Sequence, residues 1–290
     1  MTTWEVASEV RSILAEAPMW DEDAQRLWYV DIEGHRAHGF DLDGPGVARD
    51  LGGVVGAVIP ADDGDMLWAL GHEIRKGAWD DPAPRVVASV PGAGDGTMRL
   101  NDAACDPRGR LWFDDMSPDF VPGSSSLYRL DADGPTRVMT GCELGNGMGW
   151  SPDGSTMYFV DSRARTVHAL DYDVATGEAS APRAWLDVPE LDGYADGLTV
   201  DAEGGVWIAM YLGSAVRRYA ADGTLSEVVE LPVSKPTSVC FGGPDLTDLY
   251  VTTSCWRLPP EELAAQPEAG RLLVVPGAGV GLPSARYAGR

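Results

Sequence analysis

Short clusters of apolar residues recur along the whole chain, and a polar turn precedes each of them. Each cluster spans about five residues and places an aliphatic residue next to an aromatic one. This pattern is typical of β-strands bounded by tight Asp/Gly turns, and no long stretch has the period of a helix. The clusters with their turns read DEDAQRLWYVD, DDGDMLWAL, DPRGRLWFDD, SPDGSTMYFVD, DAEGGVWIAM and GPDLTDLYVTT.

The aromatic members of these clusters repeat at a nearly constant spacing. Successive members lie 40, 44, 46, 49 and 43 residues apart, and they are Trp28, Trp68, Trp112, Tyr158, Trp207 and Tyr250. A period of about 40–50 residues with several strands per unit is typical of a β-propeller. We therefore predict an all-β, six-bladed β-propeller. Six unrelated hairpins in a β-sandwich or in two domains are the alternative, which the regular spacing disfavours.

The repeat also bears on domain organisation. No linker rich in Pro, Gly or Ser interrupts it, so we predict a single domain over residues 1–290. A ring of blades must close, and residues 4–10 have the pattern of a strand. We expect this strand to complete the last blade beside residues 271–275, which would remove a free sheet edge.

Composition limits the partners and the compartment. The chain is 44% hydrophobic and has a formal net charge of −23 at pH 7. Nucleic acids and anionic membranes require clustered Lys and Arg, so neither is an expected partner, and no obligatory protein partner is evident. The start, MTTWEVASEV, lacks the features of a signal peptide, and no apolar run approaches the ~18 residues of a membrane span. The four cysteines form no CxxC motif, so we expect reduced thiols and a cytoplasmic location.

Polar residues occupy an equivalent position in four of the six repeats. They lie 11 or 12 residues before the repeated aromatic residue, and they are Glu16, Asn101, Asn146 and Asp196. The other two repeats carry Gly56 and Ser238 at this position. The innermost strand of each propeller blade lines the channel, so equivalent positions converge near the axis. Taken singly, each residue is interpreted as a turn residue that bonds the backbone, but together they predict a metal site.

The donor atoms limit which metal fits. Carboxylate and amide oxygens suit Ca²⁺, Mg²⁺ or Mn²⁺, and with water ligands also Zn²⁺ or Fe²⁺. We expect one divalent cation of this group as the cofactor. A His-rich zinc site or a Ser-His-Asp triad is disfavoured, since no histidine lies at the repeated position; the four are His35, His38, His72 and His168.

The four polar residues stand within longer motifs, which occur in a fixed order. The motifs read EAPMWD, RLNDAACDPRGR, NGMGWSPDG, YADGLTVDAEGGVWIA, LPVSKPTSVCFGG and QPEAG. They resemble those of regucalcin (the senescence marker protein) and of the bacterial sugar-acid lactonases, which include the gluconolactonases. The resemblance covers nearly the whole chain and implies a six-bladed propeller with one divalent cation at one end of the channel. It implies that Glu16, Asn146 and Asp196 are the metal ligands.

The resemblance also implies a substrate site that contains Arg99 and Asn101 beside Glu16. Asp119 lies near the place of a further acidic substrate contact, in a loop that differs from the family pattern. Arg99 in a surface salt bridge is the alternative, and Asn101 either binds substrate or reaches the metal through a water. The family often has Asn-Asp-Gly-Lys where residues 101–104 read Asn-Asp-Ala-Ala, so any contact made by that lysine is missing here.

We therefore expect a metal-dependent lactonase that opens a sugar-acid lactone, such as an aldonolactone, to the free hydroxy acid. A bound cation polarises the carbonyl, lowers the pKa of a bound water and stabilises the developing oxyanion. Asp196 either orients or deprotonates that water, or serves only as a ligand. Another hydrolase on the same fold, such as a phosphotriesterase or an aryl esterase, and a non-enzymatic Ca²⁺-binding regulator are the alternatives.

One segment interrupts the last blade. Residues 255–270 form the longest insertion within a repeat, and PEEL after Pro259 predicts a helical turn. The segment either overhangs one mouth of the channel and shapes the pocket or is a plain connection. Trp256 in this segment is interpreted as a core residue, as are Trp20 and Trp150.

Overall fold

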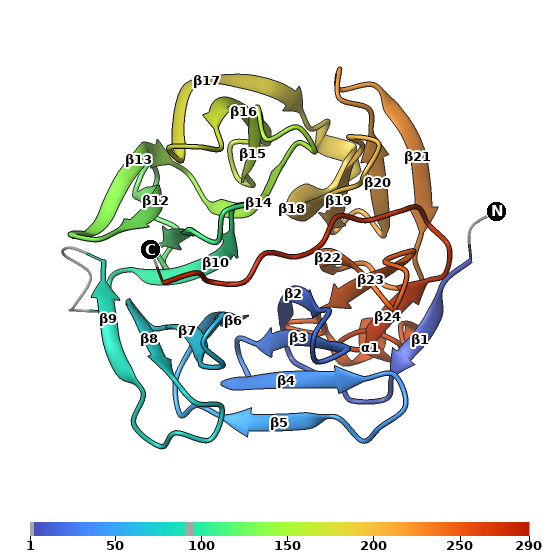
Figure 1. Ribbon diagram of the computed structural model, residues 1–290. Helices are drawn as coiled ribbons and strands as arrows, with labels where there is room; N and C mark the ends of the chain where they lie inside the picture. The colour runs from blue at the N-terminus through green and yellow to red at the C-terminus, as the bar shows by residue number, and fades with distance from the viewer. Residues whose placement is uncertain (1–2, 91–95, 290) are drawn as a thin grey trace.

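The computed structural model of the protein describes residues 3–90 and 96–289. Six four-stranded sheets are arranged in a ring around one central channel (Figure 1). Neighbouring strands within each sheet pair antiparallel, and the innermost strands face the channel. The prediction of a six-bladed β-propeller is confirmed.

The blades follow one another along the chain, and their strands run outward from the channel. The innermost strands are β2 (Ala15–Asp21), β6 (Val55–Pro60), β10 (Arg99–Cys105), β14 (Gly145–Trp150), β18 (Tyr194–Val200) and β22 (Pro236–Gly242). The second strands are β3 (Arg26–Asp31), β7 (Met66–Leu70), β11 (Leu111–Met116), β15 (Thr156–Asp161), β19 (Val206–Tyr211) and β23 (Asp248–Thr253). The third strands are β4 (Arg36–Asp41), β8 (Glu73–Gly77), β12 (Ser125–Asp131), β16 (Thr166–Asp173), β20 (Ala215–Tyr219) and β24 (Leu272–Val275).

The outermost strands complete the blades, and two short helices of the described residues lie in connections between strands. These strands are β5 (Val47–Asp50), β9 (Arg85–Ser89), β13 (Gly134–Cys142), β17 (Glu178–Asp187), β21 (Leu225–Glu230) and β1 (Glu5–Ser8). The helices are the 3-10 segment η1 (Glu190–Asp192) and α1 (Pro260–Ala265), and α1 confirms the helical turn expected there. No helix in the described ranges is long and apolar enough to cross a membrane.

The two ends of the chain close the ring. Strand β1 pairs antiparallel with β24, with Glu5 opposite Val274 and Val6 opposite Leu273. The predicted pairing of residues 4–10 with residues 271–275 is confirmed, over somewhat shorter strands. This pairing completes the sixth blade and pairs the edge of β24 that would otherwise be free.

The repeated aromatic residues are the core of the blades. All six lie on the second strands, and each has an exposed fraction of 5% or less. They pack between neighbouring sheets. Trp207, for example, makes an edge-on contact with Phe241 of the next blade. Truncating such a side chain to Ala typically costs about 3–5 kcal/mol, so the period of the sequence reflects the packing of the blades.

The turn before each repeated aromatic residue contains an aspartate, and blade 5 illustrates its role. Asp201 ends the inner hairpin of blade 5, and its carboxylate accepts the backbone N–H groups of Glu203 and Gly205. The same carboxylate accepts the indole N–H of Trp207 at 2.9 Å. Aspartate in a turn accepts hydrogen bonds from backbone N–H groups a few residues further along the chain. The aspartate of the turn therefore stabilises the hairpin and also orients the buried indole.

The last residues form a feature that the sequence did not reveal. Residues 276–289, here called the C-terminal strap, cross the channel on one face of the ring (Figure 1). The strap bonds the inner hairpins of several blades, for example through Ala202 N–H to Val280 O and Tyr287 N–H to Pro60 O. Its Arg286 also pairs with Asp21 of blade 1. The strap therefore ties together blades that are distant in sequence.

Candidate metal and substrate site

The inner strands share a local irregularity that aims side chains into the channel. The register shifts by one extra residue in all six inner strands. In the four strands that carry a candidate residue, the shift lies between Glu16 and Met19, Leu100 and Ala103, Gly145 and Met148, and Ala195 and Leu198. Such a bulge bends the strand and re-aims a side chain. The candidate residue of each strand lies at the start of its bulge, so the repeated position in the sequence is the same structural position in four blades.

Two glycines beside the candidate ligands allow the inner strands to approach closely. A Cβ atom on Gly147 would lie 2.4 Å from the backbone N of Leu198, and one on Gly197 would lie 1.9 Å from Ser238 Oγ. Neither position has room for a side chain. The glycine that follows Asn146 is therefore required by the contact of blade 4 with blade 5, and the one that follows Asp196 by the contact of blade 5 with blade 6.

The candidate residues meet in one cavity of about 480 Å³ at the end of the channel remote from the strap. Its lining includes five of the six predicted site residues, which are Glu16, Arg99, Asn101, Asn146 and Asp196. Asp119 is the exception: it is exposed, and its neighbours Pro118 and Phe120 line the cavity in its place. The substrate contact predicted for Asp119 therefore has no support from its position.

Hydrogen bonds hold Arg99 and Asn101 as a unit. Arg99 Nη1 donates to Asn101 Oδ1 at 2.8 Å and to the backbone oxygen of Leu100 at 2.9 Å. Asn101 Nδ2 donates to the backbone oxygen of Gly145 at 2.9 Å. The amide of Asn101 is thus fixed at both ends, and the remaining N–H groups of Arg99 are available to a ligand.

Asn146 is oriented by a residue from the next loop. Its Nδ2 donates to Ser162 Oγ at 3.2 Å, and the Ser162 hydroxyl donates to the backbone oxygen of Ala195 at 2.7 Å. This use of the amide nitrogen leaves the carbonyl oxygen of Asn146 as the atom available to a cation.

The carboxylates of the site are only partly compensated. Burial outweighs the backbone N–H of Ala17 and the charge of Arg99, which lower the pKa of Glu16. It also outweighs the Asn146 amide, which lowers the pKa of Asp196. Burial raises the pKa of Glu16 well above its usual range, and the nearby charges of Asp196 and Asp102 raise it further. Burial and Asp102 likewise raise the pKa of Asp196, and burial raises that of Asp102 to about 6. Glu16 keeps some exposed surface because it faces the cavity, but the surrounding protein still removes it from bulk water. Tyr211 lines the same cavity as Glu16 and Asp196. Burial raises its pKa, and the charges of Asp196 and Glu16 raise it further.

The donor set fits a hard divalent cation. Asp196 Oδ1 is buried and has no hydrogen-bond donor, which is costly for a carboxylate unless a cation occupies the position. Glu16 adds a second carboxylate and Asn146 an amide oxygen, which are ligands that Ca²⁺ and Mg²⁺ prefer. The described residues contain no cluster of three or more His, Cys, Asp or Glu placed to hold a metal.

The last residues of the second strands and the loops that follow them add lining residues that the repeat did not predict. They are Glu33, Met116, Phe120, Ser162, Arg163, Tyr211, Trp256 and Arg257. Trp256 was interpreted as core only, and this was incomplete: it packs partly against the core and also lines the cavity. Residues 255–270 therefore do shape the mouth of the channel. Trp20 and Trp150 are buried as predicted.

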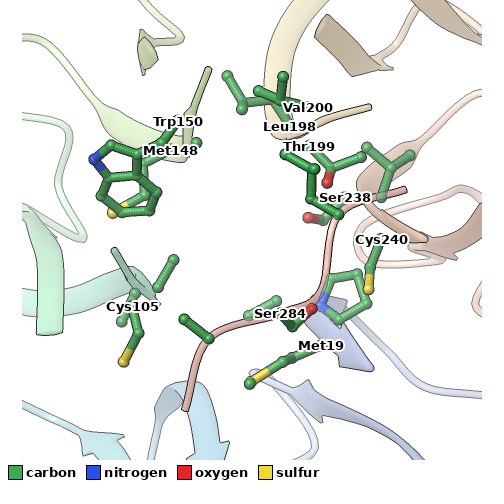
Figure 2. Close-up of a pocket in the computed structure, with 18 of the residues that line it drawn as sticks. Met19, Cys105, Met148, Trp150, Leu198, Thr199, Val200, Ser238, Cys240 and Ser284 are labelled. Carbon is green, nitrogen blue, oxygen red and sulfur yellow. The ribbon is translucent and has the colours of Figure 1, made fainter. Parts of the chain in front are cut away.

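A second cavity of about 420 Å³ lies at the strap end of the channel. Figure 2 shows its lining, which includes the sulfur-bearing side chains of Met19, Cys105, Met148 and Cys240 around the strap residue Ser284. Apolar side chains predominate, and Asp102 is the one carboxylate among the described residues that line this cavity, so it lacks the converging carboxylates of the first cavity. The polar cavity is therefore the candidate site.

Comparisons with known proteins show the family of the chain. A family model described as SMP-30/Gluconolactonase/LRE-like region matches residues 14–255. Pentonolactonase XacC of Haloferax volcanii is 40% identical over 243 residues, which are 83% of this chain and 81% of that protein. Regucalcin of Xenopus laevis is 33% identical over 293 residues, which cover 98% of this chain and 97% of that protein.

A solved structure also superposes on this protein over nearly its whole length. A crystal structure of regucalcin from Agrobacterium tumefaciens, described as a calcium-binding protein, superposes with a TM-score of 0.90 at 26% identity. The superposition covers 97% of this chain and 96% of that chain. With the family model matched over most of its length, the chain belongs to the SMP-30/gluconolactonase/LRE-like family.

Proposed function

We propose that the protein is a divalent-metal-dependent hydrolase that opens sugar-acid lactones, with Glu16, Asn146 and Asp196 as the metal ligands. The observation that carries the proposal is the unpartnered, buried Oδ1 of Asp196 in the same cavity as Glu16 and Asn146. A dication would compensate the two carboxylates, whose pKa values burial raises.

The bound cation would supply Lewis-acid polarisation of the lactone carbonyl and a lowered pKa for an attacking water. The chain contributes the remaining parts. Asp196 has two carboxylate oxygens, so one can serve the cation while the other orients the water or accepts its proton. The N–H groups of Arg99 that are not bonded to Asn101 or Leu100 would hold oxygen atoms of the substrate by charge-assisted hydrogen bonds.

Relatives support the substrate class. The 40% identity with a pentonolactonase favours aldonolactones as the starting panel. The regucalcin structure described as calcium-binding favours Ca²⁺ as the first cation to test. A protein that only bound Ca²⁺ would have no need for the fixed pair of Arg99 and Asn101 beside the ligands, and this pair favours an enzyme.

The test measures acid release from a panel of aldonolactones. The protein is stripped with a chelator and then reloaded with Ca²⁺, Mg²⁺, Mn²⁺, Zn²⁺ or Fe²⁺ singly. We expect hydrolysis to vanish on chelation and to return with at least one metal, and Glu16→Gln to prevent its return. The proposal fails if a folded, metal-loaded protein hydrolyses no lactone, or if activity survives complete chelation.

A further inference from the structure

Two arginines at the rim of the cavity have no carboxylate partner in the parts of the chain that the structure describes. The Arg163 guanidinium lies 5.1 Å from the ring centre of Phe120, and that of Arg257 lies 4.0 Å from the ring of Trp256. Stacking on an aromatic face leaves the N–H groups at the edge of a guanidinium available to another ligand. Both arginines line the cavity and are exposed.

Location distinguishes these two arginines from the others. Nine other arginines form ion pairs with Asp or Glu. Stacking without an ion pair to a described residue also occurs at an arginine that does not line the cavity, as Arg165 over the ring of Tyr194 shows. Arg163 and Arg257 are the stacked arginines that line the candidate cavity, so a ligand that enters it can reach their N–H groups.

The charge balance of the cavity favours an anion. Its lining carries three carboxylates, on Glu16, Glu33 and Asp196, against the three guanidinium groups of Arg99, Arg163 and Arg257. Asp102 adds one carboxyl group close behind Glu16 and Asp196. A dication held by Glu16 and Asp196 would still leave the cavity positive in a strongly negative molecule. Cavity walls of low dielectric constant concentrate such a field and attract ligands of opposite charge.

The wall behind Arg257 is rigid. Lys235 is buried, and its Nζ donates to the backbone oxygen of Trp256 at 2.7 Å. The backbone N–H of Trp256 donates to Ser254 Oγ at 3.0 Å, and Arg257 itself adopts a φ of 54°. A left-handed φ is costly for a residue other than glycine and persists where its surroundings impose it. The backbone that carries Arg257 is therefore held in place before any ligand binds.

We propose that the preferred substrate is a lactone that carries an anionic group, a carboxylate or a phosphate, away from its lactone carbonyl, and that Arg163 and Arg257 bind this group. The inference rests on the proposed lactonase function and names its substrate class. Guanidinium groups bind carboxylate and phosphate alike by paired hydrogen bonds, and the cavity of about 480 Å³ has room for a lactone ring with such a substituent.

The experiment compares kcat/KM for three lactones: a neutral aldonolactone, a lactone of an aldaric acid with a free carboxylate, and a phosphorylated aldonolactone. The metal-loaded protein is tested with Arg163→Gln, Arg257→Gln and Arg257→Lys. Arg183→Gln is the matched control, because Arg183 is exposed and paired with Asp171 at the outer part of blade 4. Each assay is repeated at high ionic strength.

We expect the wild type to prefer one of the anionic lactones by about tenfold or more, and added salt to weaken this preference. At least one Gln variant should reduce the anionic-to-neutral ratio about tenfold, with partial recovery in Arg257→Lys and no change in Arg183→Gln. A preference for the lactone with the free carboxylate, or for the phosphorylated lactone, supports the inference and identifies which anionic group is bound. Hydrolysis of neutral lactones with a ratio near one, or a ratio that neither Gln variant alters, overturns it while the proposed function stands. If no lactone is hydrolysed, the proposed function itself fails.

Discussion

The side-chain amide of Asn146 donates a hydrogen bond to Ser162 Oγ at 3.2 Å, and the Ser162 hydroxyl passes a second bond to the backbone of Ala195. Ser162 therefore connects a candidate ligand of blade 4 with the residue that precedes Asp196 in blade 5. Ser162 acts on the candidate site through these two hydrogen bonds, so we assign it the role of a positioning residue. Partners of this kind commonly tune metal affinity 10–100-fold.

We expect Ser162→Ala to weaken cation binding about tenfold, while Asn146→Ala weakens it further. The physical reason is that the amide of Asn146 loses the bond that fixes which of its ends faces the cation. Calorimetric titration of the stripped protein with Ca²⁺ measures the effect. Ser155→Ala is the control, because Ser155 is exposed and its hydroxyl donates to Asp153 within a turn. Equal affinities for Ser162→Ala and wild type would contradict the positioning role.

The ring and the candidate ligands were predictable because both repeat. A blade must bury an aromatic residue on its second strand, and its inner strand must reach the axis, so Trp207 and Asp196 keep a fixed separation in sequence. The bulge of each inner strand preserves this geometry from blade to blade.

The rim of the cavity was not predictable, because its residues come from loops that do not repeat. Ser162 and Trp256 follow second strands of different blades, but the loops differ in length and carry no shared pattern. The strap was missed for a related reason: Tyr287 and its neighbours form isolated bridges rather than a strand with alternating polarity. Asp119 was placed by resemblance in a loop that departs from the family pattern, and its position gives that role no support.

The contact of Gly197 with Ser238 predicts a large cost for any side chain at this position. A Cβ atom there would lie 1.9 Å from Ser238 Oγ and 2.6 Å from Ser238 Cα, so the backbone of β22 would have to move. We expect Gly197→Ala to lower the free energy of unfolding by about 1–3 kcal/mol, measured by urea titration. Gly53→Ala is the control, since its nearest neighbour, Leu70 Cδ1, lies 3.8 Å away. Equal midpoints for the two variants would show that blades 5 and 6 can separate without cost.

Cation binding should be coupled to proton release. Burial and the neighbouring carboxylates raise the pKa values of Glu16 and Asp196 in the cation-free protein, so these groups retain protons at pH values where free carboxyls have lost them. A cation must displace these protons, and its affinity should therefore rise with pH. Titrations at pH 5.5 and pH 8 in buffers of different ionisation enthalpy measure both quantities. Affinity that is independent of pH, without proton release, would indicate that both carboxyls are already ionised.

Asp201 should make the stability of the fold depend on pH, because its pKa is lowered, whereas those of Glu16 and Asp196 are raised. Burial alone would raise its pKa, but hydrogen bonds from Arg218, Trp207 and the backbone of Gly205 outweigh burial and hold the pKa below its usual value. The folded protein therefore binds this proton less readily than the unfolded chain. The resulting stabilisation is present above the ordinary Asp pKa of about 3.8 and is lost as the pH falls through the lower folded value.

Replacement of Asp201 by Asn tests this. We expect Asp201→Asn to reduce the free energy of unfolding by about 1.5–3 kcal/mol at neutral pH, since a charged acceptor of several bonds is lost. The difference from wild type should shrink in acid, as measured by urea titrations between pH 7 and pH 3. Asp245→Asn, at an exposed position, should change little. A difference that stays constant over this range would contradict the lowered pKa.

Asp21 of blade 1 is the counterpart of Asp201, but its arginine comes from the strap. It accepts the indole N–H of Trp28 at 3.2 Å, and Arg286 Nη2 lies 2.5 Å from its Oδ1. In blade 5 the corresponding arginine, Arg218, belongs to the same blade, with Nε 2.6 Å from Asp201 Oδ2. The strap therefore supplies to blade 1 an interaction that blade 5 makes by itself.

We expect Arg286→Gln to destabilise the protein by about 1–2 kcal/mol, at the lower end for a charged hydrogen bond because the guanidinium is partly exposed. Asp21 is only 4% exposed and would lose its cationic partner. Thermal unfolding measures the loss, with Arg36→Gln at an exposed position as the control. Since the strap lies at the end of the channel remote from Asp196, cation affinity should not change. A loss of cation affinity without a loss of stability would mean that the strap acts on the site rather than on the ring.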